Sequence, residues 1–199
     1  MHNTVKNLID IEKNIKNYTD ELKIHSQPKI IAVSKTFKVE KFLPLIEYGH
    51  IHFGENKVQE AVDKWTEIKK TNSKIKLHMI GKLQTNKVKF AVRLFDFIHS
   101  VDSEKLANKI SHEQLKINKK IKIFLQVNIG DENQKSGINK NEVGKLVSFS
   151  EEIGLNVIGL MCIPPVNSDP EGFFVEMNKL NKDLGLAELS MGMSSDYLI

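Results

Sequence analysis

The chain has 199 residues, a formal net charge of +4 and one cysteine, Cys162. This length fits one large domain or two small ones. The basic residues are almost all lysines, and Arg93 is the only arginine, which argues against sequence-specific DNA or RNA binding through arginine–base contacts. A lone cysteine excludes an internal disulfide and fits a reducing cytoplasm. The N-terminal segment is too polar for a signal peptide, and no apolar run approaches the ~20 residues that a membrane-spanning helix requires.

Apolar residues spaced by three and four predict a first helix over residues 8–22, and Gln27-Pro28 breaks it. Short apolar runs then alternate with helical patterns. The predicted strands cover 30–34, 51–53, 77–80, 97–101, 121–128, 157–161 and 186–191, and the later helices cover 39–48, 58–70, 85–95, 104–116, 140–153 and 173–184. We expect Gly49 and Gly154 to end the helices that precede them, and Asp102-Ser103 to cap the helix that follows.

This alternation of about seven strands with helices predicts a parallel sheet covered by helices. The number of units favours an α/β TIM-type (β/α)8-like barrel over an open sheet. No linker or low-complexity segment interrupts the pattern, so residues 1–199 are expected to form a single domain. The loops that follow the strands form the active face of such a barrel, and GEN, IGK, NIG and MGM each follow a predicted strand.

Lys35 follows the first predicted strand, in the stretch KIIAVSKTF. This position places the lysine at the mouth of the barrel. Burial disfavours the charged form of a lysine, and the neutral amine can attack a carbonyl carbon to form a Schiff base. A solvated or salt-bridged lysine is the alternative, and the strand-end position alone does not separate the two.

Two polar clusters suit a ligand that carries a phosphate. The segment from Ser190 to Asp196 follows the last predicted strand, and its hydroxyls and backbone amides can form an anion-binding nest or a plain helix cap. Gly54-Glu55-Asn56 also opens a helix, where Asn56 either caps the helix or hydrogen-bonds a ligand ring. The polar loop 128–137 is interpreted as a lid or as an ordinary surface connection.

A metal-dependent hydrolase is the rival chemistry. His50 and His52 have the spacing that places two imidazoles on one face of a strand, and His78 and His99 lie on other strands. However, His50 directly follows Gly49 and so lies at the beginning of its strand, away from the active face. No aspartate follows the last strand in the expected place, so no metal site is predicted.

Six motifs occur in order: AVSKT, FGENKVQE, HMIGKLQTNK, VNIGDENQKSG, GLMCIPP and LSMGMSSD. From about Ile30 to the C-terminus, they resemble the pyridoxal phosphate homeostasis proteins, single-domain relatives of the alanine racemase barrel. The resemblance implies a TIM-type barrel with an added N-terminal helix. It also implies a protein that holds pyridoxal 5′-phosphate (PLP) and buffers its supply, without an established catalytic turnover. We expect this protein to be cytoplasmic and monomeric, and closure of the barrel by dimerisation is an open alternative. Lys35 would carry PLP as a Schiff base, Asn56 would lie beside the ring, and Ser194 and Ser190 would bind the phosphate.

The implied partners are PLP and the apoenzymes that use it, with no nucleic acid, membrane or metal. Lys57 departs from the family, which has an aromatic residue after GEN. The family also continues past MGMS with a helix, a strand, a phosphate loop and an arginine facing the pyridine nitrogen, whereas the sequence stops at Ile199. We therefore expect a barrel that lacks its last strand and retains the cofactor less tightly. Two alternatives stay open: a PLP-dependent racemase-like enzyme, and a truncated remnant with weakened cofactor binding.

Overall fold

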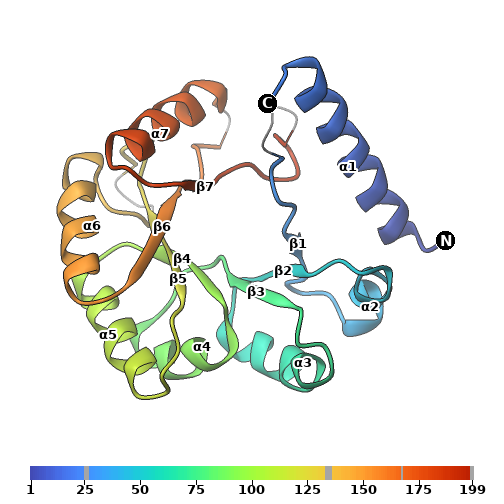
Figure 1. Cartoon of the computed structure of the whole chain (residues 1–199), viewed down its shortest axis with the longest axis horizontal. Coiled ribbons are helices and arrows are strands. Elements are labelled where there is room, and N and C mark those ends of the chain that lie inside the picture. Colours follow the sequence, from blue (N-terminus) through green and yellow to red (C-terminus); the bar gives the residue numbers. More distant parts are fainter. Residues whose placement is uncertain (25–26, 133–135, 167, 198–199) are drawn as a thin grey trace.

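A computed structural model describes residues 1–24, 27–132, 136–166 and 168–197 of the chain. One seven-stranded sheet runs through these residues in the order β1-β2-β3-β4-β5-β6-β7, and every neighbouring pair is parallel. The strands are β1 (Ala32–Val33), β2 (His52–Glu55), β3 (Lys76–Met79), β4 (Phe97–Val101), β5 (Lys122–Gln126), β6 (Asn156–Met161) and β7 (Glu188–Ser190). The sheet curves around a central space, and helices cover its outer side (Figure 1).

The helices alternate with the strands as the sequence predicts. They are α1 (Asn3–Glu21), α2 (Val39–Tyr48), α3 (Val58–Thr71), α4 (Val88–Leu94), α5 (Glu104–Leu115), α6 (Val143–Glu152) and α7 (Glu171–Asp183). Two predicted helices begin differently, since single 3₁₀ turns, η1 (Thr85–Lys87) and η2 (Lys140–Glu142), precede α4 and α6. The predicted strand 121–128 is shorter in the structure, because the chain leaves the sheet after Gln126.

The predicted helix boundaries have local causes. Gly49 ends α2 with a φ of 104°, a left-handed conformation that glycine adopts without the steric cost of a Cβ. Gly154 follows α6 with a φ of 78°. At the start of α5, the Ser103 hydroxyl accepts a hydrogen bond from the Leu106 N–H and satisfies one of the free amides of the first turn. These predictions of glycine stops and a serine cap are confirmed.

The apolar face predicted for the first helix is correct only in part. Leu8 is buried, but Tyr18 is 48% exposed and Leu22, just past the helix end, is 65% exposed. The buried residues of α1 are Val5, Leu8 and Thr19. Because α1 precedes β1 and packs beside α2 at the margin of the sheet, it has a neighbour over only part of its length. Apolar spacing alone did not reveal how far that contact extends.

The two edges of the sheet approach each other across the central space. Lys29 lies before β1 and Glu188 opens β7, yet Lys29 Nζ is 3.3 Å from Glu188 Oε1. In Figure 1 the segment after β7 runs toward the start of β1. Among the described residues, β1 pairs only with β2 and β7 pairs only with β6. The sheet therefore curves like a barrel while these two strands remain its edges.

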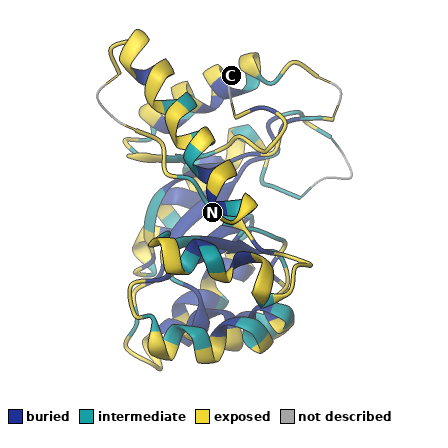
Figure 2. Cartoon of the chain, turned by 90° about the vertical axis from the view of Figure 1, so that its right-hand side faces the viewer, coloured by how far each residue is buried: buried dark blue, intermediate teal, exposed yellow. Residues whose placement is uncertain are grey.

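The hydrophobic core lies mainly between the sheet and the surrounding helices. Figure 2 shows buried residues along the strands and on the helix faces that meet them, with exposed residues on the outer faces. Trp65 of α3 and Phe53 of β2 are both fully buried there, and their ring centroids are 4.9 Å apart. No helix in the described ranges is long and apolar enough to cross a membrane.

Candidate functional site

The four residues predicted to bind the cofactor all lie at or beyond the carboxyl ends of strands. Lys35 is in the turn just after β1, and Asn56 directly follows β2. Ser190 is the last residue of β7, and Ser194 lies in the segment that follows β7. Because β1 and β7 are the two edges that approach each other, these residues come from both sides of one opening.

The wall of the central space near Lys35 can be traced around Gly54 of β2. A Cβ at Gly54 would lie 3.0 Å from Ile31 Cγ2 and 3.5 Å from Val33 Cγ2, so these side chains share its face of the sheet. On the other face, Glu55 bonds to Ser34 and to Trp65 of α3. Ser34 thus points toward the helices, and the alternation of side chains along β1 predicts that Lys35 follows Val33 toward the central space.

A buried carboxylate fixes the end of β1. Glu55 is fully buried, and its Oε1 accepts hydrogen bonds from Ser34 Oγ at 2.8 Å and from Trp65 Nε1 at 3.0 Å. The same oxygen lies 2.9 Å from Lys64 Nζ, whose side chain is 12% exposed. A charge-assisted contact at this burial is much less screened by solvent than one on the surface. The carboxylate therefore connects β1, β2 and α3 one residue away from Lys35.

Lys64 extends this connection to the turn itself. Its Nζ donates to the Ser34 carbonyl oxygen at 2.7 Å and to the Phe37 carbonyl oxygen at 3.1 Å. Glu60, one helical turn earlier on α3, lies 2.7 Å from the same Nζ. The carbonyl groups on either side of the Lys35 turn are thus held by one ammonium group. We call Ser34, Glu55, Glu60 and Lys64 the turn clamp.

The clamp also holds a strained residue. Thr36 has a φ of 65°, which is unfavourable for a β-branched side chain. Its backbone N–H donates to Glu60 Oε1 at 2.6 Å. The hydrogen bond from Lys64, followed by the one from Thr36, lowers the pKa of Glu60, so this carboxylate is charged at neutral pH. Lys35 is exposed and has no hydrogen-bond or ion-pair partner within the described residues.

Asn56 presents an unsatisfied polar atom at the same end of the sheet. Its Oδ1 is buried and has no hydrogen-bond partner among the described residues. The chain after β3 passes very close by, since a Cβ on Gly81 would overlap the Asn56 carbonyl oxygen and lie 2.7 Å from its Cα. Buried polar atoms are normally paired, so this amide is suited to a ligand that donates a hydrogen bond.

The segment after β7 is folded back by Asp196. The Asp196 carboxylate accepts the Met193 N–H, and the Asp196 N–H donates to the Met193 carbonyl oxygen at 3.1 Å. Gly192 has a φ of 88°, which allows the tight reversal. Ser194 is exposed within this turn, whereas Ser190 is partly buried and hydrogen-bonded to His99. The turn is compatible with either an anion site or a cap.

The histidines of the metal hypothesis do not surround a common point. His52 Nδ1 lies 3.0 Å from His78 Nε2, and His78 Nδ1 lies 2.9 Å from His99 Nε2, so the rings form a chain. His50 precedes β2 and its Nε2 contacts the His52 carbonyl oxygen at 2.8 Å. No cluster of three metal-ligating side chains occurs in the described part of the chain.

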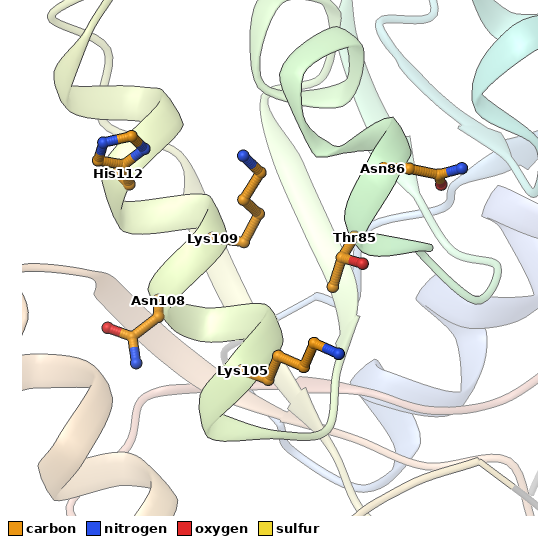
Figure 3. A pocket seen from close by; sticks show the side chains of 6 residues that line it. All are labelled: Thr85, Asn86, Lys105, Asn108, Lys109 and His112. Carbon is orange, nitrogen blue, oxygen red and sulfur yellow. The ribbon is translucent and has the colours of Figure 1, made fainter.

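A surface pocket lies elsewhere, away from the strand ends. It has a volume of about 510 Å³ and is lined by η1 and α5 on the outer, helical side of the molecule (Figure 3). The lining residues are Thr85, Asn86, Lys105, Asn108, Lys109 and His112. None of the four predicted cofactor-binding residues contributes to it. The loop 128–137 is described only outside residues 133–135, so its interpretation as a lid falls partly outside the described residues.

Comparison with known proteins decides the family. Residues 7–199 match the family described as alanine racemase, N-terminal domain. A pyridoxal phosphate homeostasis protein of Pasteurella multocida is 35% identical, over 96% of this chain and 87% of its own length. A protein of the same name from Aquifex aeolicus is 34% identical, over 85% of this chain and 78% of its own length. The chain belongs to the pyridoxal phosphate homeostasis protein family.

Solved structures agree with this family. PipY of Synechococcus elongatus, in a structure with PLP bound, is 31% identical and superposes with a TM-score of 0.78, covering 92% of this chain and 91% of that one. An alanine racemase of Clostridium difficile, 14% identical with a TM-score of 0.66, shares the fold over 50% of its own chain. The expectation of an alanine racemase N-terminal barrel-like fold is thus confirmed.

Sequence reasoning missed the turn clamp and the histidine chain. The spacing of Glu60 and Lys64 by four residues was a visible sign of an ion pair on one helix face. That spacing does not show that Lys64 also reaches across to β1 and β2. The histidines were considered as metal ligands and that hypothesis was rejected, but spacing along separate strands does not show which ring nitrogens meet.

Proposed function

We propose that this chain binds PLP and acts in PLP homeostasis, with the cofactor held at the carboxyl end of the sheet by Lys35. Support comes from the relatives named for this role and from PipY, which has a structure with PLP bound. The observation that supports the assignment to Lys35 is the local structure around its side chain. An exposed, unpartnered amine sits in a strained turn whose two sides are fixed by a buried ion pair.

The residues present fit this cofactor. PLP supplies an aldehyde carbon that a lysine amine can attack reversibly, with loss of water. Lys35 supplies the amine, and the turn clamp limits where its backbone can move. Asn56 would lie beside the ring, and its unpartnered Oδ1 would accept a hydrogen bond from a ring hydroxyl. This contact would satisfy the buried amide oxygen, which otherwise costs roughly 1–3 kcal/mol.

Ser190 and Ser194 are assigned to the phosphate. Ser190 is the last residue of β7 and Ser194 lies in the segment after it, at the edge of the sheet that faces β1 across the opening. A ligand attached to Lys35 can therefore extend toward both serines. Hydroxyl groups donate short hydrogen bonds to phosphate oxygens, and such charge-assisted bonds are stronger than neutral ones. We treat residues 1–199 as one barrel domain, with α1 as the helix added before β1.

We propose a carrier role rather than an enzymatic one. Racemisation needs an acid/base group near the substrate carbon. Of the three tyrosines, Tyr18 of α1 and Tyr48 of α2 lie in the outer helical layer and are 48% and 50% exposed, and Tyr197 follows the turn after β7 and is 37% exposed. A carrier needs only reversible attachment and phosphate binding, which the assigned residues provide.

Trapping with borohydride tests the proposal. The protein is mixed with PLP, reduced, digested and examined by mass spectrometry. We expect stoichiometric modification of Lys35, because its exposed amine lies at the same end of the sheet as the proposed phosphate-binding serines. Lys35→Ala should abolish the modification. Lys38→Ala, which removes an exposed lysine three residues later, serves as the matched control and should leave the labelling of Lys35 unchanged.

Labelling scattered over many lysines at equal levels in Lys35→Ala would overturn the proposal and favour a remnant without a cofactor site. Production of D-alanine from L-alanine above the level of the Lys35→Ala protein would instead overturn the carrier role and leave cofactor binding in place.

A further inference from the structure

A row of hydrogen-bonded imidazoles crosses the inside of the sheet and ends on Ser190. His52, the first residue of β2, meets His78 of β3, and His78 meets His99 of β4. His99 Nδ1 then lies 2.7 Å from Ser190 Oγ on β7. Since β5 and β6 separate β4 from β7 in the sheet, this last contact spans the central space. The row thus links the start of β2 to the predicted phosphate end of the site.

The row is tightly packed. His78 is 4% exposed and stacks on Phe97 with ring centroids 4.1 Å apart. His99 is 1% exposed and stacks on Phe124 at 4.4 Å. Burial is the main reason that the pKa of His78 falls to about 2 and that of His99 to about 3. Both rings are therefore neutral at physiological pH, and the stacking fixes their planes.

Neutrality restricts how the row can be protonated. A neutral imidazole has one N–H donor and one acceptor nitrogen. His78 uses both nitrogens within the row, so when its Nδ1 donates to His99, its Nε2 must accept from His52. Only two arrangements satisfy every contact. Either all donors point toward Ser190, or all point away from it.

The two arrangements differ at Ser190. When the donors point away from Ser190, the Ser190 hydroxyl donates its hydrogen bond to His99 Nδ1. Its oxygen can then only accept a hydrogen bond from a ligand. When the donors point toward Ser190, His99 Nδ1–H donates to Ser190 Oγ, and the hydroxyl hydrogen is free for another acceptor. A phosphate oxygen is an acceptor only, so it can be bound by Ser190 in the second arrangement and is repelled in the first.

We propose that His52, His78 and His99 form a positioning row that directs the Ser190 hydroxyl to donate to the phosphate of the bound ligand. The inference rests on the proposed function, because it concerns the phosphate end of the same site. It assigns a role to two buried histidines, His78 and His99, and to the partly buried His52. Ligand binding and histidine tautomer are then coupled, and each must bias the other.

Affinities for two ligands test the row. PLP and pyridoxal share the aldehyde, but only PLP has the phosphate. His99→Phe keeps an aromatic ring beside Phe124 and removes the donor to Ser190. We expect it to weaken PLP binding about fivefold, the worth of one net hydrogen bond, with pyridoxal binding unchanged. In a Ser190→Ala background the same change should have no further effect on PLP, because the group that it positions is gone. His112→Gln, at an exposed histidine of α5, is the control.

Nitrogen NMR of the histidine side chains in the wild-type protein provides a second readout that needs no variant. On addition of inorganic phosphate or PLP, His78 and His99 should be found with the proton on Nδ1, the less common tautomer of an isolated histidine. A purely structural role would not make the tautomer depend on phosphate.

The outcomes separate the two proposals. If borohydride trapping modified Lys35 with neither PLP nor pyridoxal in the wild-type protein, the proposed function itself would be wrong. Normal PLP binding together with an equal loss of PLP and pyridoxal affinity in His99→Phe would overturn the row and leave the function standing. Phosphate-bound histidines with the proton on Nε2 would overturn it as well.

Discussion

Lys64→Ala is expected to lower the free energy of unfolding by about 3–5 kcal/mol, the cost of leaving a buried charge without its partner. Glu55 is fully buried, and Lys64 is the cation that contacts its Oε1. The substitution also removes the donor that holds the Ser34 and Phe37 carbonyl oxygens. Urea denaturation followed by the fluorescence of Trp65, the only tryptophan, measures the loss.

The same helix provides the control. Lys70 pairs with Glu67 at 2.6 Å, but both side chains are mostly exposed, at 64% and 79%. Exposed pairs contribute only about 0–1 kcal/mol, so Lys70→Ala should change stability little. If Lys64→Ala and Lys70→Ala lowered stability equally, the idea of a buried clamp would be wrong. The rate of PLP attachment to Lys35 should also fall in Lys64→Ala alone, because the Thr36 turn loses its support.

Gly159→Ala is expected to be the second severe substitution, because β6 and β7 pair too closely there for a side chain. A Cβ at Gly159 would lie 2.6 Å from the Glu188 carbonyl carbon and closer still to its oxygen. Gly159 and Glu188 are register partners, so one backbone must move. We expect a loss of about 3 kcal/mol, the upper end for overpacking, measured as a lower midpoint of thermal unfolding.

Displacement of β7 should also disturb the proposed phosphate site. Ser190 lies two residues beyond Glu188, so PLP should be held less tightly while pyridoxal is less affected. Gly172→Ala is the matched control, since nothing lies within 4 Å of a Cβ in the first turn of α7. Alanine there should be neutral or stabilising by up to ~1 kcal/mol. A stable Gly159→Ala protein with unchanged preference for PLP would show that β7 does not need this close pairing.

The fold could be predicted because its signals are local. Each apolar run is followed by a helical pattern, and residues such as Gly49 and Ser103 mark the boundaries through their own backbone chemistry. The positions of Lys35 and Asn56 at strand ends followed from the same alternation. The predicted face of α1 failed at Tyr18 because burial there depends on how far α2 extends, which spacing does not encode.

The contacts of the site could not be predicted in the same way. Lys64 contacts Ser34 because α3 packs across β1 and β2, and His99 contacts Ser190 because the sheet curves. Both contacts join residues of separate elements, so they depend on how those elements pack and not on the spacing of neighbouring residues. Motif resemblance predicted Lys35 as the cofactor lysine but gave no information on what holds its turn in place.

The sequential strand order has a consequence for biosynthesis. The groups that fix the Lys35 turn lie within 30 positions of one another, from Ser34 to Lys64, so they can assemble early as the chain leaves the ribosome. Ser190 meets His99 across 91 positions, and Lys29 meets Glu188 across 159. Contacts between distant residues form slowly because a long loop must close first. If Lys35 binds PLP as proposed, its amine is available in the nascent chain before Ser190 is in place, and a preference for a phosphorylated aldehyde arises only once β7 has paired with β6.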